Sequence, residues 1–488
     1  MMFLDMILSW ATFTLVASAV LVSPWLFGAW EVWWFWPFVV CIFMAIALFS
    51  LRLLIRGFAG VSLAVKKGEL ASQAYLDAMT EQDATNGRLK VLCVTSFLIF
   101  LAYVVARFLH AEVVMDAQRS LLLFLSTFLL GVTIVFGFDN DKNRLFHRLI
   151  LIDLLLIGLY GVINHIGWHN KLVMWADGYP QYFLDNRATG PYFCPDHFSG
   201  LMEIALSLAL GFLLAREVRW QWRMFASVVA LVAFTGIVLS KSRGGGLTVI
   251  VMAFAVLACG FSQWPRVIRW YLRGAGVALL ILVLGIVCCI ATAYIERFAS
   301  AREMQMAKAR SFAENRALLI EVIRESSRGR MIAGALRAWD SSRLLGIGPG
   351  MHQNLWPHFA ASPDGNRELG KWPSLLNNEF HSYEVHCDWV QLLEEYGIVG
   401  LVLFLVMASV IFAILMLGLR RERLERLHHN WQSIGMGYHP LLLGGIFASV
   451  ALFVHSFGDF NLQIPATVWL LTAVVAIPVA CVVRDDRL

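Results

Sequence analysis

Two short stretches of the chain combine phosphate-binding and proton-accepting residue types beside apolar runs. The first is SKSRGGG at residues 240–246, and the second is HCDWVQLLEEYG at residues 386–397. Arginine binds phosphate through a planar fork of donors, and histidine can accept a proton near neutral pH. Binding of a phosphorylated lipid is one of the few reasons for an apolar chain to place these residues at the mouths of its spans.

Arg243 follows one apolar run and precedes three glycines at the start of the next. The glycines allow a tight turn and leave backbone N–H groups at the start of the following helix, where a nearby arginine favours phosphate binding. The alternative is an arginine that snorkels beside an ordinary glycine turn. Lys241, its neighbour, is interpreted first as a headgroup contact.

His386 opens a helical pattern that runs directly into an apolar span, so its imidazole should lie at the membrane surface. There it could act as a general base, position a hydroxyl group, or cap the helix. Glu395 could orient the same site or cap the span. His381, Glu384 and His386 lack the spacing of a helical H-E-x-x-H pair, so we expect no metal site.

Arg330 lies in a long polar connection, where a solvated charge is the simplest interpretation. It precedes the run LLGIGPGMH at residues 344–352. This run lacks the lysine and the strand–helix context of a nucleotide phosphate loop, so we interpret it as a structural turn.

The composition is that of a membrane protein. Hydrophobic residues make up 59% of the 488 residues, charged residues 15%, and the mean hydropathy is +0.68. Apolar runs of about 20 residues, long enough to cross a bilayer, recur along the whole chain. The net charge of +5 fits basic loops at anionic lipid headgroups and does not require nucleic-acid binding.

We expect an all-α polytopic membrane protein with about twelve transmembrane helices in a single domain, residues 1–488. The predicted spans are 6–28, 32–51, 91–110, 121–138, 149–162, 198–215, 225–240, 246–261, 275–295, 397–417, 440–457 and 466–483. The connection at 296–396, between spans nine and ten, is expected to be a large helical extracytoplasmic loop, with one or two helices over 314–340.

Basic residues indicate the orientation. With both termini in the cytoplasm, the short inner connections carry roughly three times as many Lys and Arg residues as the outer ones. Arg243 and His386 then lie on the same extracytoplasmic face. Cys194 and Cys387 also fall in outer segments, and a disulfide between them stays open because sequence does not show proximity.

Four local matches, in order along the chain, resemble the O-antigen ligase family and the related O-antigen polymerases. Residues 187–198 resemble the family's R-x-x-G…N-P-N segment, and residues 242–245 its S-R-G turn. Arg330 with the glycine run at 345–350 resembles its arginine and L-G-x-G-x-G block. Residues 386–397 resemble its H-N-x-x-L-x-x-x-x-E-x-G signature. The matched region, 187–400, is about half of the chain.

The resemblance implies a GT-C-like glycosyltransferase of the bacterial inner membrane with its active site facing the periplasm. The donor would be a glycan linked to undecaprenyl diphosphate, and the acceptor a hydroxyl of lipid A–core or of a growing glycan, with no cofactor and no metal. Arg243 and Arg330 would bind the diphosphate, and His386 would activate or position the acceptor hydroxyl. The further substrate-binding residues would be Arg187, Lys241, Asp196 and Glu395.

Three positions depart from the family's pattern. Cys387 and Asp196 stand where asparagine is usual, and Val390 where leucine is usual. An amide both donates and accepts hydrogen bonds, whereas an ionised carboxylate only accepts. The acceptor contacts therefore carry over less directly than the donor contacts.

Several functions remain open. A ligase and a polymerase would share their catalytic parts, and transfer to protein is a third variant. A transporter or flippase predicts polar groups near the bilayer midplane and two similar halves, which we do not find; His455 and Asp459 are its best candidates. A membrane scaffold would tolerate loss of Arg243 or His386.

Overall fold

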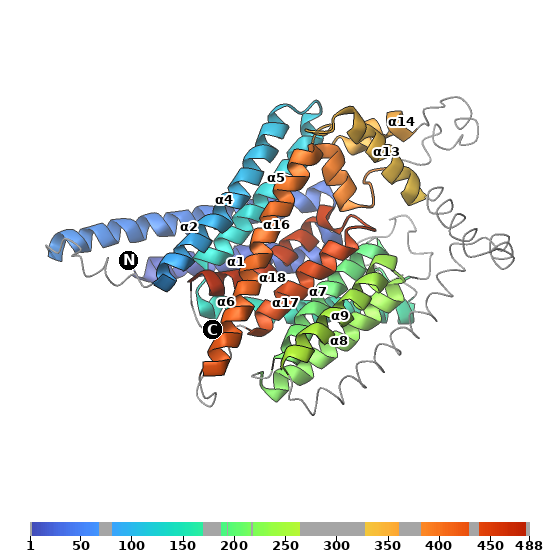
Figure 1. The fold of residues 1–488 in the computed structure, drawn as a ribbon. Coiled ribbons are helices and arrows are strands. Elements are labelled where there is room, and N and C mark those ends of the chain that lie inside the picture. Colours follow the sequence, from blue (N-terminus) through green and yellow to red (C-terminus); the bar gives the residue numbers. More distant parts are fainter. Residues whose placement is uncertain are drawn as a thin grey trace, which may run out of the picture.

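The computed structural model describes residues 2–67, 81–168, 187–192, 194–215, 218–263, 327–360, 382–428 and 439–484. Helices and turns make up these residues, and no strand occurs among them (Figure 1). The all-α prediction is therefore confirmed for the described part of the chain.

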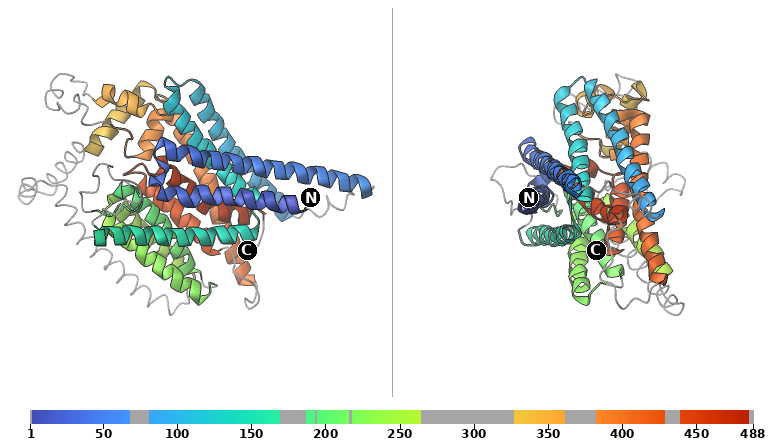
Figure 2. Two further views of the ribbon diagram at one scale, coloured as in Figure 1. Left: turned by 180° about the vertical axis from the view of Figure 1, so that it is seen from behind. Right: turned by 90° about the vertical axis from the view of Figure 1, so that its left-hand side faces the viewer.

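Five long helices form the first half of the bundle: α1 (Met2–Val22), α2 (Val32–Lys67), α4 (Glu81–Leu109), α5 (Val114–Val132) and α6 (Asn140–Trp168). Two short 3-10 turns join α1 to α2, and the φ of 70° at Gly28 between them is a value that favours glycine. Figure 2 shows that the axes of α1, α2 and α6 lie nearly parallel along one side of the bundle.

The second half contains six long or apolar helices: α7 (Pro195–Leu214), α8 (Trp220–Ser240), α9 (Arg243–Gln263), α16 (Asp388–His428), α17 (His439–His455) and α18 (Pro465–Arg484). Two shorter helices, α13 (Ser327–Ser341) and α14 (His352–Ala360), precede α16.

The helices agree with a protein that crosses the membrane many times. In the described residues, nine helices are long and apolar enough to span a bilayer, and α17 and part of α9 are shorter apolar helices. Together they coincide with eleven of the twelve predicted spans (nine plus two). The ninth predicted span, 275–295, lies outside the described residues, so the count of twelve stays a prediction.

The core of the bundle is centred on α7. Of the apolar window of α7, 83% is buried, the highest share among the nine candidate spans in the described residues. The helices α6, α8, α9 and α17 pack around it. A charged side chain inside this helix, such as Glu203, is therefore enclosed by protein and needs an internal partner.

The helices α13 and α14 lie at one end of the bundle. Figure 1 shows them, in gold, at the same end as the turn between α4 and α5 and the start of α16. They pack on each other and on α16. The helix α13 covers the second part of the helical region predicted at 314–340, and residues 314–326 lie outside the described residues.

The glycine run at 345–350 packs on the start of α16. Ile347 N donates to Glu394 O (2.8 Å) and Gly348 N to Glu395 O (3.0 Å). Gly346 has a φ of 77°, and a Cβ atom there would lie 2.5 Å from the carbonyl oxygen of Glu395. The interpretation of this run as a structural turn is confirmed, since glycine is required for close approach of two backbones.

Candidate functional site

Several helices begin or end at one place, around the turn at residues 456–461 that follows α17. Ala188 N, just before α7, donates to Leu239 O at the end of α8 (2.9 Å). Arg328 of α13 donates from Nη1 to Gly458 O (2.8 Å). The turn is thus in contact with α13, and α7 and α8 are joined just before α7 begins.

Asp388, the first residue of α16, holds this turn beside the start of its own helix. Its Oδ2 accepts hydrogen bonds from Ser456 Oγ (2.8 Å) and Leu462 N (3.0 Å), and its backbone N donates to Ser456 O (3.0 Å). The carboxylate is buried. These bonds explain why residues so far apart in the sequence as His386 and Asp459 can meet.

His386 and Asp459 form a hydrogen-bonded pair. His386 Nδ1 lies 3.0 Å from Asp459 Oδ1, which also accepts from Phe460 N (2.9 Å). Burial alone would raise the pKa of the Asp459 carboxyl, but the hydrogen bond from His386 and the nearby His197 and Arg328 hold it well below its usual range. An ionised Asp459 accepts the Nδ1 hydrogen and so leaves Nε2 of His386 as the proton-accepting nitrogen.

The backbone of His386 is in a left-handed conformation, with a φ of 57°. Non-glycine residues rarely adopt this conformation, and it is found preferentially at functional sites. The ring meets Phe460 edge to face at a centroid distance of 4.6 Å, and His197 meets the same ring at 4.5 Å. The side chain of His386 is 26% exposed, so one end of it is open to a substrate.

Two arginines share the carboxylate of Asp196 at the start of α7. Arg187 Nη2 lies 2.5 Å from Asp196 Oδ1, and Arg328 Nη2 lies 2.7 Å from Asp196 Oδ2. Arg328 also lies 3.7 Å from Asp459 Oδ2. Although burial lowers the pKa of Arg328, the charges of Asp459 and Asp196 raise it by more, so this guanidinium stays charged. It is 27% exposed, whereas Arg187 is buried.

Arg243 is the first residue of α9 and is exposed. Ser242 caps this helix, because its Oγ accepts from Gly245 N (3.3 Å). Arg187 Nε donates to Ser240 O (2.7 Å), which ties the end of α8 to the segment before α7. Lys241 between them is exposed and left-handed, with a φ of 50°.

Glycines 244 and 245 let the start of α9 lie directly on polar side chains of α7 and α17. A Cβ atom at Gly244 would lie 2.5 Å from Nε2 of His455. A Cβ atom at Gly245 would clash with Ser199 Oγ and lie 3.3 Å from Glu203 Oε1. The two glycines of the S-R-G-G sequence are therefore explained by close packing on α7 and α17 as well as by the turn before α9.

Replacing Gly244 by alanine is expected to destabilise the protein by about 1–3 kcal/mol, because the added methyl group overpacks the His455 ring. Gly246→Ala is the matched control: apart from its chain neighbours and its own helix backbone, no atom of the described residues lies within 4 Å of its Cβ position. Alanine there should be neutral or stabilise the helix by up to about 1 kcal/mol. The melting temperatures of both variants in detergent measure the difference. Equal changes in melting temperature would contradict the close packing of Gly244 on the His455 ring.

The predicted residues are brought together in part. Arg187 and Asp196 are in direct contact with each other, and the 240–243 turn joins them to Arg243. His386 reaches the same cluster through Asp459 and Arg328. Arg330 is half-buried on α13, two residues from Arg328, and on a helix residues at this spacing face different directions.

Glu395 and its neighbour Glu394 hold the glycine run and α14. Glu395 accepts from Gly350 N (2.9 Å) and from Gln391 Nε2 (3.3 Å). Glu394 is paired with Nδ1 of His352 (2.8 Å), and both side chains are fully buried. These contacts fit an anchoring role for both glutamates.

Arg328, Asp459 and Phe460 were not among the predicted site residues, although Asp459 was noted as a transport candidate. The polar run HSFGDFN at 455–461, placed after an apolar span at the same face as His386, is the signal that could have indicated Asp459. Cys194 and Cys387 are both free thiols, so the disulfide left open by the sequence is not formed in the structure.

One group of side chains has the proximity of metal ligands. The ligand atoms of Cys194, His197 and Asp459 all lie within 4.8 Å of one another. However, Oδ1 of Asp459 already accepts two hydrogen bonds, and burial raises the pKa of the Cys194 thiol, which opposes the thiolate that a metal requires. With Arg328 close to the same carboxylate, the surroundings favour an anion over a second cation.

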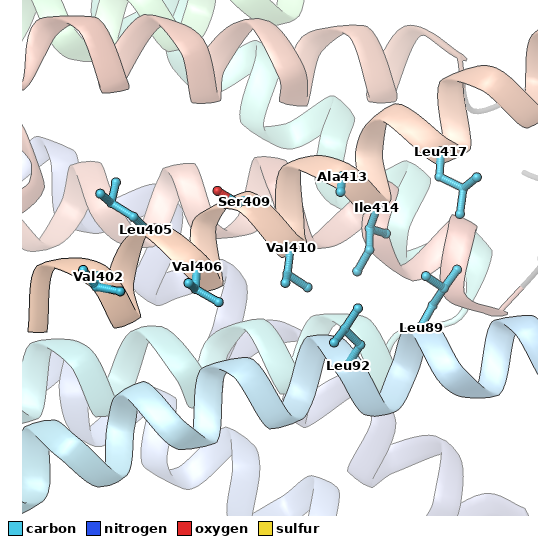
Figure 3. A pocket seen from close by; sticks show the side chains of 10 residues that line it. All are labelled: Leu89, Leu92, Val402, Leu405, Val406, Ser409, Val410, Ala413, Ile414 and Leu417. Atoms are coloured by element: carbon cyan, nitrogen blue, oxygen red, sulfur yellow. The ribbon is translucent and has the colours of Figure 1, made fainter. Parts of the chain in front are cut away.

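A separate apolar groove lies between α4 and α16, with a volume of about 520 Å³. Figure 3 shows that Leu89 and Leu92 of α4 face the α16 side chains across it. Among the described residues that line it, Ser409 is the one with a polar side chain. Such a lining suits lipid chains and offers no group for catalysis.

Two comparisons with known proteins bear on this site. A family model described as O-Antigen ligase matches residues 228–405. The matched region contains Arg243, Arg328, Arg330 and His386, whereas Asp196 and Asp459 lie outside it. No curated protein matches the chain. The family match confirms the resemblance that the four sequence motifs indicated.

Proposed function

We propose that this multi-pass membrane protein, whose residues 228–405 match the O-antigen ligase family, is a glycosyltransferase that moves a glycan from undecaprenyl diphosphate to an acceptor hydroxyl. The proposed acceptor is lipid A–core, at the periplasmic face of the bacterial inner membrane. The alternative within the family is a polymerase that extends a lipid-linked chain. The family supplies ligases and polymerases in general; the donor, the acceptor and the face of the membrane are our proposals.

The observation that carries the proposal is the His386–Asp459 pair beside charged guanidinium groups. We propose that Nε2 of His386 takes the proton of the acceptor hydroxyl while the oxygen attacks the anomeric carbon. The bond from that carbon to the diphosphate oxygen breaks, and its electron pair leaves with the diphosphate. Asp459 keeps the Nδ1–H tautomer and stabilises the imidazolium that forms, as in other base–carboxylate pairs.

The leaving diphosphate carries several negative charges. Arg243, Arg330 and Arg328 are the proposed donor-binding residues, because guanidinium groups bind phosphate with two parallel hydrogen bonds and can stabilise it without a divalent metal. Arg187, Asp196 and Lys241 support this set, Arg187 and Asp196 by holding the arginine network and Lys241 at the turn. Glu395 contributes indirectly, through the start of α16.

The test is transfer by the purified protein in nanodiscs, with a labelled undecaprenyl-diphosphate glycan and lipid A–core as acceptor. We expect a single-step product, no loss of rate in EDTA, and rates at least about a hundredfold lower in His386→Ala and Arg243→Ala. Arg243→Lys should recover only part of the rate, because an ammonium lacks the planar fork.

Three results would change the proposal. A ladder of longer lipid-linked glycans would assign a polymerase. Undiminished transfer in Arg243→Ala would remove the donor-site assignment, and a strict requirement for a divalent ion would contradict the metal-free reaction.

A further inference from the structure

A buried histidine–glutamate pair lies beneath the start of α9 and takes no part in the proposed reaction. His455, the last residue of α17, and Glu203 of α7 are 1% and 0% exposed at their side chains, and Nδ1 of His455 lies 2.7 Å from Glu203 Oε1. The same Oε1 accepts from Ser199 Oγ (3.1 Å). With Glu203 ionised, the hydrogen is on Nδ1, so this pair fixes the ring orientation of His455.

The other edge of the His455 ring faces α9. Nε2 and the neighbouring ring carbon lie against Gly244, with no room for a Cβ atom between them. Nε2 is buried and has no hydrogen-bond partner among the described residues. One turn further along, Thr248 Oγ1 donates to Ala451 O (3.4 Å), so α9 and α17 are in contact on the same side. Gly244, the residue next to Arg243, thus packs directly on the His455 ring.

The backbone of His455 contacts the other half of the site. Its carbonyl oxygen accepts from Gly458 N (2.8 Å), and Gly458 O in turn accepts from Arg328 (2.8 Å). Gly458 directly precedes Asp459, the partner of His386. His455 therefore touches, through its ring, the helix that carries Arg243 and, through its backbone, the turn that carries Asp459.

We infer that His455, held by Glu203, is a positioning residue that sets the distance between the donor-binding Arg243 and the His386–Asp459 pair. This inference rests on the proposed role of Arg243. A ring of fixed orientation between two helix ends makes a rigid spacer, and small displacements of a binding group cause large losses of affinity and rate. A merely structural residue would change stability without changing how Arg243 binds the donor.

The experiment measures donor KM, kcat and the rise in melting temperature caused by glycan-free undecaprenyl diphosphate, in nanodiscs of the full chain. His455→Ala is expected to raise donor KM about tenfold with little change in kcat, and to reduce the melting shift. In Arg243→Ala/His455→Ala, KM should equal that of Arg243→Ala, because the histidine acts only through the arginine. His439→Ala, which removes a second buried histidine at the opposite end of α17, is the matched control and should leave KM unchanged.

If His455→Ala does not fold, His455→Asn serves instead, because its amide can donate to Glu203 while the ring over Gly244 is lost; the same rise in KM is expected. A normal KM and a normal melting shift in the folded variant would overturn the positioning role, as would additive effects in the double variant. If Arg243→Ala itself binds undecaprenyl diphosphate normally, the proposed donor site fails and this inference fails with it. If donor binding is weakened in Arg243→Ala but not in His455→Ala, the positioning role of His455 is overturned and the proposed donor site stands.

Discussion

Replacing Asp459 by asparagine should lower the rate of glycan transfer by about a hundredfold to ten-thousandfold, the range over which general base catalysis and its orienting carboxylate act. The carboxylate accepts the Nδ1 hydrogen of His386 at 3.0 Å and is fully buried. An asparagine amide can instead donate to Nδ1, which places the imidazole hydrogen on Nε2 and removes the proton acceptor. The initial rate with saturating donor and acceptor measures the effect.

Titration of Asp459 itself should add no pH dependence to the activity of the wild-type protein in the pH range of the assay. Because its pKa in the folded protein is well below the usual range, wild-type Asp459 stays ionised as pH falls through the ordinary aspartate pKa. Stability that depends on this charge is present above the unfolded-state pKa and is lost only as pH falls through the lowered folded-state pKa.

Asp340→Asn is a suitable control for Asp459→Asn, since Asp340 is exposed and pairs with Arg343, three residues further along the chain. Full activity in Asp459→Asn would exclude the proposed pair.

Arg328→Ala is expected to cause the second large loss, in both transfer and stability. Its removal leaves Asp196 with Arg187 as its ion-pair partner among the described residues, and it takes away a positive charge 3.7 Å from Asp459 Oδ2. Loss of one member of a buried ion pair costs about 3–5 kcal/mol, and the partial exposure of Arg328 should reduce this to about 2–3 kcal/mol. Melting temperature, transfer rate and donor KM together separate the two effects.

Arg330→Ala, two residues away on α13, is the comparison that identifies the donor-binding face of this helix. We expect it to raise donor KM with a smaller effect on stability than Arg328→Ala, because Arg328 is the residue that pairs with the buried Asp196 and lies near Asp459. Equal stability losses in the two variants would contradict this view of α13. A normal donor KM in Arg330→Ala would restrict the diphosphate contacts to Arg243 and Arg328.

Local sequence was sufficient to predict that Arg243 and His386 lie at the starts of helices, whereas their roles stay predictions. Arg243 and His386 could be selected because each adjoins an apolar span, and the spans themselves follow from hydropathy. The glycine run at 345–350 was also interpreted correctly, since it lacks the residues that a nucleotide loop needs. The four motifs in order then indicated the family.

The remaining features of the site depend on tertiary contacts, which the sequence does not show. Two apolar helices, α16 and α17, separate Asp459 from His386 in the sequence, and the bonds of Asp388 to Ser456 and Leu462 bring the two residues together. No local pattern contains that information. The choice between Arg328 and Arg330 depends on the rotation of α13 against α7, which spacing within one helix cannot define. Glu203, enclosed in α7, pairs with a residue from a distant helix for the same reason.

The left-handed backbone of His386 has a consequence for how this protein could evolve or be engineered. Glycine would adopt a φ of 57° with less strain than histidine, so His386→Gly would relieve the backbone. The same change would take a hydrogen bond from the buried carboxylate of Asp459, so the two effects on stability oppose each other. We infer that the strained conformation is retained for the proposed role of the imidazole.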